Sequence, residues 1–259
     1  MNIPEDSPEQ DRLALQIIQL REQGLLVRDQ TADAESRGLT RGTTADGDVW
    51  TDLPFMIPDM TKHWLDEHAG MSSAQRISFS KFIAKLAAAG AGRNDGLCGI
   101  ALLTFREALE TDRPLGISAD QEQAEDPERH DADLTIAAYL PCVTVWLAWA
   151  GEKIIQLSEK KKALSNTEPG PLFRNANTAS DTSIGFSAER WIFWLSRLES
   201  LSKSFQASGE DTLSVYATRM MDNMLNIVDG VGGQLKKDLA AAYSSGLVEY
   251  RVVPIRGVH

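Results

Sequence analysis

The sequence predicts an all-α fold, a single helical domain of about seven to nine helices around an apolar central helix. Apolar residues recur at spacings of three and four along most of the chain, most clearly over residues 186–205. Residues 134–151 contain no charged side chain. Residues 247–253 alternate as a strand does, but no second strand pattern is present, so we expect this tail to pack on helices in an extended form.

Residues 1–49 are predicted to form one helix and a flexible loop, and residues 50–259 a helical core domain. Ser7 and Pro8 are typical of an N-cap and a first helical residue, and the apolar spacing then continues to about Gln23. Residues 31–48 are rich in Gly, Thr, Asp and Arg, which predicts a mobile connection.

The core domain is predicted to begin with a helical segment from Trp50 to Gly70, with a break or offset near Pro58. An acidic spacer over 120–133 and a Pro, Asn, Ser and Gly loop over 166–185 interrupt the later helices. Pro141 is expected to kink the central helix if that helix is continuous there. The later helices are predicted over residues 72–90, 97–111, 134–163, 187–207, 211–228 and 235–243.

Charge restricts the partners that we expect. The net charge of −11 repels phosphate backbones and anionic lipid, so neither nucleic acid nor a membrane surface is expected to bind. The lysines at 160–162 lie at a predicted helix C-terminus, where cations complement the helix dipole. Residues 134–151 reach the lower length limit of a transmembrane helix. Thr, Tyr and Pro lower the hydrophobicity of this segment, so a buried helix is favoured over a transmembrane helix.

The cysteines and the N-terminus bear on location. Cys98 and Cys142 both lie within apolar helical patterns, where buried free thiols are expected. The acidic residues at the N-terminus do not match a secretory signal. We therefore expect a cytoplasmic, reducing location.

Three places in the sequence partly resemble metal or phosphate motifs, but neither a metal site nor a cofactor is expected. The histidine cluster at His63, Asp66, Glu67 and His68 lacks the i, i+4 histidine pair of a helical zinc site. His130 has acidic neighbours without the spacing of a calcium loop. The glycine-rich residues 229–234 follow a predicted helix rather than a strand, which indicates a helix end instead of a phosphate loop.

The tryptophan-rich helix that follows Ser187 has two possible roles. In the structural alternative, which the sequence favours, Ser187 caps the helix, Glu189 complements its positive end and Arg190 pairs with a neighbouring helix. In the functional alternative, Arg190 lies at the mouth of an aromatic cavity and binds a carboxylate or an enolate. The candidate ligand pocket then consists of Arg190, Glu189, Trp191, Trp194 and Trp149.

Five blocks of sequence carry a family resemblance: residues 50–54, 75–86, 105–110, 146–151 and 189–198. Together they resemble a family of fungal helical proteins of unassigned function, and the Glu-Arg-Trp-Ile-Phe-Trp block at 189–194 is the most specific part. Gln75 stands where the family usually has an acidic residue. The resemblance implies a fungal origin, an intracellular helical domain, and no catalytic residues to transfer. Members of such families sometimes accompany natural-product enzymes.

The sequence contains no recognisable catalytic set, so function cannot be assigned from it. Our interpretation is a soluble, intracellular helical binding or accessory protein that engages a protein partner. The alternative is a cofactor-independent enzyme or a carrier of fungal small-molecule (secondary) metabolism, with an aromatic pocket between helices.

Overall fold

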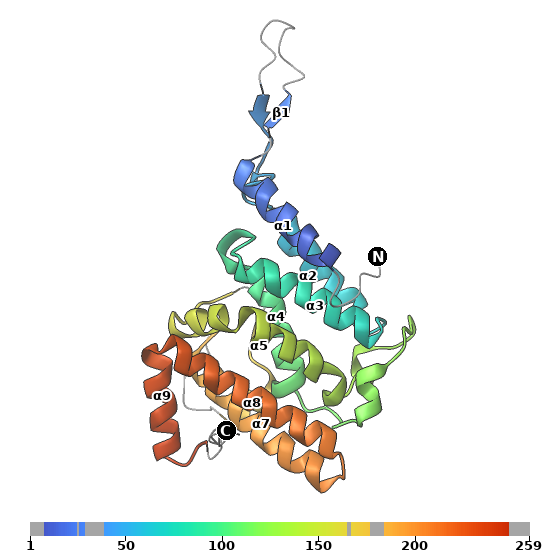
Figure 1. The fold of residues 1–259 in the computed structure, drawn as a ribbon, viewed down its shortest axis with the longest axis vertical. Helices are drawn as coiled ribbons and strands as arrows, with labels where there is room; N and C mark the ends of the chain where they lie inside the picture. The colour runs from blue at the N-terminus through green and yellow to red at the C-terminus, as the bar shows by residue number, and fades with distance from the viewer. Residues whose placement is uncertain (1–7, 25, 29–38, 165–166, 177–183, 249–259) are drawn as a thin grey trace, which may run out of the picture.

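A computed structural model describes residues 8–24, 26–28, 39–164, 167–176 and 184–248. These ranges contain nine α-helices and only two short antiparallel strand pairs, which confirms the all-α fold. Figure 1 shows α1 at one end of the molecule and α7, α8 and α9 at the other. The helices are α1 (Pro8–Gln23), α2 (Met56–Glu67), α3 (Ser73–Ala88), α4 (Cys98–Phe105), α5 (Ile136–Glu159), α6 (Pro171–Ala176), α7 (Ala188–Ala207), α8 (Asp211–Val231) and α9 (Gly233–Ser244).

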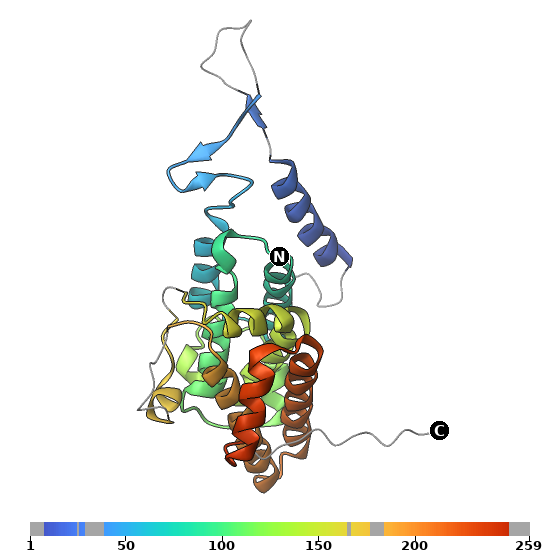
Figure 2. The ribbon, with the colours of Figure 1, turned by 90° about the vertical axis from the view of Figure 1, so that its left-hand side faces the viewer.

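The strands follow α1 and are short. β1 (Leu26–Arg28) pairs antiparallel with β2 (Leu39–Arg41), and β3 (Thr43–Thr44) pairs antiparallel with β4 (Gly47–Asp48). Figure 2 shows these strands beside α1, on the opposite end of the molecule from α9. Three 3-10 turns, Arg93–Asp95, Ser118–Glu122 and Asp131–Asp133, lie within the connecting segments.

Helix α5 lies in the centre of the core, packed against α3, α7 and α8. Most of its side chains are buried, among them Tyr139, Trp146 and Ile154. Gly151 allows α8 to approach closely, because a Cβ atom there would lie 2.5 Å from Cδ1 of Ile227. Burial among other helices therefore accounts for the uncharged stretch 134–151. Within the described ranges, no helix combines the length and the apolar content that a membrane crossing requires.

Both cysteines are buried thiols, as the sequence predicted. Cys98 lies in α4 and Cys142 in α5. Burial raises the pKa of the Cys98 thiol to about 12, so this side chain behaves as an apolar group rather than as a nucleophile.

Some predicted boundaries were wrong. Helix α2 begins at Met56 rather than Trp50, and Pro58 lies in its first turn, where a missing N–H breaks no helical hydrogen bond. Residues 39–48, predicted as loop, contain β2 to β4. Gly47 at φ +129° permits the tight turn between β3 and β4.

One further difference lies in the second half of the chain, where one other prediction is not tested. The predicted loop 166–185 contains the short helix α6, which begins at Pro171, a residue favoured at the first helical position. The predicted extended tail falls mostly on residues 249–253, which lie outside the described residues.

Candidate functional site

A groove of about 440 Å³ lies between α1, α2, α3 and the segment 125–129. Helix α3 contributes Phe79 and Phe82 to its lining, and α2 contributes His63, Asp66 and Glu67. These three α2 residues share one face of the helix because their spacing is i, i+3 and i+4. The groove therefore places aromatic rings beside ionisable side chains.

Helix α1 forms one wall of the groove through Gln10 and Leu13. Gln10 is buried, and its Nε2 donates hydrogen bonds to the backbone oxygen of Ser78 at 2.8 Å and to its Oγ at 3.1 Å. Nζ of Lys85 donates to Oε1 of Gln10 at 3.2 Å and pairs with Asp11. Specific polar contacts with α3 thus hold this wall in place.

Aromatic packing fixes the position of Phe79. The ring of Trp64 is buried and stacks parallel to Phe79, with 6.2 Å between the ring centroids. His63 packs its ring edge-on against Phe79 at 5.0 Å. Because Trp64 and His63 both belong to α2, this packing sets the distance between α2 and α3.

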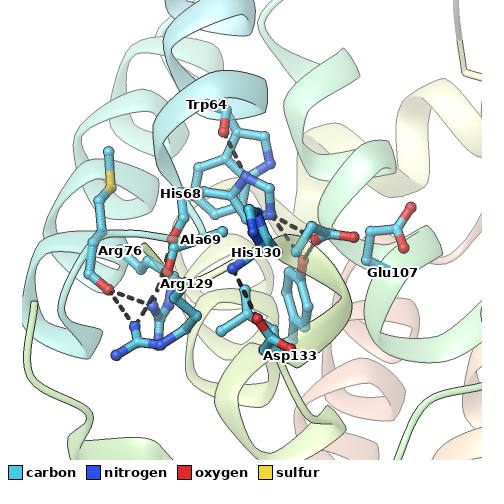
Figure 3. A network of polar contacts seen from close by, with 12 residues as sticks. Trp64, His68, Ala69, Arg76, Glu107, Arg129, His130 and Asp133 are labelled. Carbon is cyan, nitrogen blue, oxygen red and sulfur yellow. Dashed lines mark hydrogen bonds and ion pairs between the residues drawn. The ribbon is translucent and has the colours of Figure 1, made fainter. Parts of the chain in front are cut away.

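Arg129 holds another wall of the groove. Its Nη1 donates to the backbone oxygens of Ala69 and Met71, each at 3.1 Å (Figure 3). Its Nη2 donates to the backbone oxygen of Ala124 at 2.8 Å. The turn between α2 and α3 is therefore tied to the segment that follows residue 123. Arg129 is engaged with carbonyl oxygens although it lines the groove.

A second arginine reinforces the same turn from inside the protein. Arg76 is fully buried, and its Nη1 donates to the backbone oxygen of Met71 at 2.5 Å. Its Nη2 donates to Oε1 of Gln123 at 2.8 Å. Burial lowers the pKa of Arg76, and the nearby positive charge of Arg129 acts in the same direction. Gln75, the departure from the family pattern, completes a capping box with Ser72 at the start of α3.

Behind this turn lies a polar network around the buried side chain of His68 (Figure 3). Nδ1 of His68 lies 2.7 Å from the backbone oxygen of Trp64, and Nε2 lies 2.9 Å from both Oδ1 of Asp131 and the hydroxyl of Tyr139. The Tyr139 hydroxyl also donates to Asp131. Both ring nitrogens of His68 are therefore engaged within the protein, which assigns this histidine to the support of the groove.

Arg113 connects this network to the next element of the chain. Its Nη2 donates to Oδ2 of Asp131 at 2.5 Å and to Oε2 of Glu107 at 2.7 Å. Glu107 belongs to a π-helical turn, Arg106–Glu110, that continues α4. Burial acts to lower the pKa of Arg113, but Tyr139, Glu107 and Asp131 outweigh it and raise that pKa.

The surroundings of Asp131 predict that the stability of the protein depends on pH. Burial acts to raise the pKa of Asp131, but hydrogen bonds from His68, Tyr139 and Arg113 outweigh it and hold this pKa well below its usual range. A carboxyl group with a depressed pKa in the folded state stabilises the fold above its unfolded pKa of about 3.9, and this contribution is lost as the pH falls. We therefore expect the free energy of unfolding to decrease between about pH 5 and pH 2.

Urea unfolding at pH 7, 5 and 3 measures this dependence. The Asp131→Asn variant should be less stable than wild type at pH 7 and should lose less stability on acidification. Asp59→Asn, at an exposed position in the first turn of α2, serves as the control and should keep the wild-type slope. Equal slopes for wild type and Asp131→Asn would contradict this role of Asp131.

The structure places Arg190 in a separate, fully buried cluster at the start of α7. Nε and Nη2 of Arg190 donate to the two carboxylate oxygens of Glu110, at 2.8 and 2.9 Å. The same carboxylate accepts hydrogen bonds from Nε1 of Trp194 at 2.6 Å and from the backbone N–H of Gly170 at 2.7 Å. Nη1 of Arg190 donates to the backbone oxygen of Gly185 at 2.7 Å. Arg190 and Glu110 are both 0 % exposed.

The first turn of α7 matches the structural alternative drawn from the sequence. Oγ of Ser187 accepts a hydrogen bond from the backbone N–H of Arg190 at 3.2 Å, so Ser187 is the N-cap. Glu189 is paired at the surface with Lys161 at 3.3 Å. Burial acts to raise the pKa of Glu189, but hydrogen bonds from the helix start and Lys161 lower it overall.

Trp149 and the other four predicted pocket residues do not together line either of the two grooves. Trp149 is 46 % exposed and lies under the ammonium groups of Lys85 and Lys81, at 4.5 and 5.4 Å from its ring centroid. It lines a second groove, of about 360 Å³, between α5 and α8. Neither groove is lined by Arg190, Glu189, Trp191 or Trp194. A ligand role for the five residues stays a prediction.

From the sequence, the α2 residues of the groove were candidates only for a metal site, and Phe79 and Phe82 fell within the helix predicted over residues 72–90. Among the described residues, no three His, Cys, Asp or Glu side chains are placed to hold a metal ion. The shared helix face of His63, Asp66 and Glu67 was the available signal for a groove. Its aromatic lining comes from another helix, and the sequence does not show which helices meet.

Two relationships to known proteins are informative. The family model described as "Protein of unknown function (DUF3632)" matches residues 1–198. The "Oxopyrrolidines biosynthesis cluster protein G" of Penicillium oxalicum is 31% identical over 247 residues, which cover 94% of this chain and 67% of that protein. No solved structure matches the chain. The resemblance to a fungal family of unassigned function is thereby confirmed, and this chain belongs to the family described as DUF3632.

Proposed function

We propose that this protein binds a small organic molecule in the groove between α1, α2 and α3, as a carrier or accessory protein of secondary metabolism. The observation that carries this proposal is the groove itself. Its volume of about 440 Å³ lies within the usual range of small-molecule sites, and it combines aromatic rings with a few ionisable groups. The relative's name, which refers to a biosynthesis cluster, supports the metabolic setting.

The walls of the groove favour binding because they are already held in position. Gln10 fixes α1 to α3, and Arg129 fixes the segment after residue 123 to the turn between α2 and α3. A site whose walls are ordered before binding loses less conformational entropy when a ligand arrives. The groove therefore needs little rearrangement to accept a molecule.

His68 is poorly placed to act as a general base for a ligand in the groove. His63, which lines the groove, packs its ring against Phe79. His68 has both ring nitrogens engaged with the backbone of Trp64 and with Asp131 and Tyr139. A general base must reach the proton that it removes, and His68 would have to break these contacts first.

A protein partner is the second candidate. Leu15 on α1 and Leu65 on α2 are both more than half exposed, and both helices border the groove. Apolar side chains at such positions can bind a helix or a loop of another protein. This alternative predicts that a protein, rather than a small molecule, is retained on purification.

A matched pair of tryptophan variants tests the proposal. Leu13 lines the groove, whereas Leu15 on the same helix is 57% exposed and does not line it. Leu13→Trp should fill part of the groove and weaken ligand retention by about tenfold or more, a loss of roughly 1.4 kcal/mol in binding. Leu15→Trp, which adds the same side chain outside the groove, should retain ligand as wild type does.

Native mass spectrometry of the three proteins, each produced in a filamentous fungus, measures the retained mass. A small organic mass on wild type and Leu15→Trp that is lost from Leu13→Trp supports the groove. Equal retention by all three proteins would place the ligand elsewhere. A co-purifying protein without a small molecule would favour the second candidate.

A further inference from the structure

We infer that the groove selects an organic amine, a positively charged group attached to an apolar body. This inference rests on the proposed function and specifies its ligand class. Two independent features of the groove carry it, an aromatic lining and an excess of carboxylates. Each feature alone would suit many ligands, but together they suit an amphipathic cation.

The aromatic lining comes from Phe79 and Phe82, with Leu13 of α1 also lining the groove. Both phenylalanines are partly buried and pack against the core. Rings in this state bind apolar groups, and their faces also attract cations. An apolar ligand body can therefore bind here without excluding a neighbouring positive charge.

The charged lining is mostly acidic. Asp66, Glu67 and Glu125 all line the groove, and Arg129 is the one described lining residue with a permanent positive charge. Three of the five N–H groups of Arg129 donate to backbone oxygens, and its Nη2 also lies 4.0 Å from Oδ2 of Asp126. A carboxylate ligand would therefore meet three carboxylates in the lining and one arginine that is already engaged within the protein.

The carboxylates differ in how far they are engaged within the protein. Asp66 pairs with Lys62, an exposed neighbour one turn earlier on α2, so the pair is weak. Glu125 accepts a hydrogen bond from the neutral Nε2 of Gln75 at 2.9 Å, which leaves its charge uncompensated by that contact. Glu67 is exposed in the last turn of α2. The carbonyl end of that helix dipole adds negative potential beside it.

An organic cation fits this groove better than a metal ion. Within the part of the chain that the structure describes, no set of three acidic, histidine or cysteine side chains is close enough to hold a metal. A spread of single carboxylates over an aromatic surface instead suits an ammonium group, which needs one or two nearby oxygens. The net charge of −11 attracts cations to the protein as a whole.

Three probes of the same shape test the ligand class: 3-phenylpropylamine, 3-phenylpropan-1-ol and 3-phenylpropionate. Titration of each into 15N-labelled protein, followed by amide chemical shifts, gives the affinity and the location of binding. We expect the amine to bind tightest and the carboxylate weakest, with shifts concentrated in α1, α2, α3 and the segment 125–129. High salt should reduce the preference for the amine, because exposed charges are screened.

Two glutamate variants separate a local contact from overall charge. Glu67→Gln should weaken amine binding by about three- to fivefold and leave alcohol binding unchanged, as expected for one partly exposed ion pair. Glu128→Gln removes the same charge from an exposed residue outside the groove lining and should leave both affinities unchanged.

Two outcomes overturn the inference. If the carboxylate probe binds as tightly as the amine, or if Glu67→Gln leaves the ratio of amine to alcohol affinity unchanged, the groove does not select a cation. The proposed function would survive either outcome, provided that the probes still bind in the groove. If none of the three probes binds and wild type retains no small molecule on purification, the proposed function fails as well.

Discussion

Replacing Glu110 by Gln is expected to lower the free energy of unfolding by about 3–5 kcal/mol, the usual cost of breaking a buried ion pair from one side. Arg190 and Glu110 are completely buried, and Arg190 would keep its charge without a carboxylate partner. Trp194 and the backbone of Gly170 would also lose their charged acceptor. Urea or thermal unfolding of the purified variant measures the loss.

Glu189→Gln is the matched control for this prediction. Glu189 precedes Arg190 and pairs with Lys161 at the surface, where an ion pair contributes at most about 1 kcal/mol. Replacing both Glu110 and Arg190 by Met should cost less than the sum of the two single replacements, because no buried charge is left unpaired. An Arg190→Ala variant that folds normally but loses a bound ligand would instead support the functional role predicted for Arg190.

Gly185→Ala is expected to destabilise the protein by about 3 kcal/mol or more, through backbone strain and a direct clash. Gly185 has φ +106°, and a Cβ atom there would lie 2.1 Å from the backbone oxygen of Lys162. The backbone at residue 185 would have to move, and the backbone oxygen of residue 185 would then lose the hydrogen bond from Nη1 of Arg190. The effect should be visible in the midpoint of urea unfolding.

Gly209→Ala separates the clash from the strain. Gly209 also has a positive φ, +81°, but nothing lies within 4 Å of an added Cβ atom. This control should cost only about 1 kcal/mol, the penalty for a left-handed conformation. Equal losses in the two variants would show that the close approach of residue 185 to Lys162 contributes nothing to stability.

The helices could be predicted because their apolar stripes and caps are local features of the sequence. Ser187 caps α7, and the stripe from Trp191 to Phe205 lies in the core, as its spacing indicated. The uncharged stretch became the central helix α5 for the same reason. Such patterns show which face of a helix is apolar, and they do not show which helix packs against it.

The groove and the His68 network could not be predicted, because both depend on contacts between distant parts of the chain. His68 and Asp131 are 63 positions apart, and Gln10 meets Ser78 across 68 positions. The π-helical turn Arg106–Glu110, which contains Glu107 and Glu110, could not be predicted from the sequence either. Its apolar spacing differs little from that of an ordinary helix end.

Hydrogen-exchange mass spectrometry tests the central claim, that the groove between α1, α2 and α3 is the binding site. Wild type is compared with and without the small-molecule fraction of a fungal culture extract, with Leu13→Trp as the control. We expect slower exchange in α1, in the C-terminal half of α2 and over residues 125–129, and no change in Leu13→Trp or in α8 and α9. Protection confined to α8 and α9, or equal protection in Leu13→Trp, would contradict the claim.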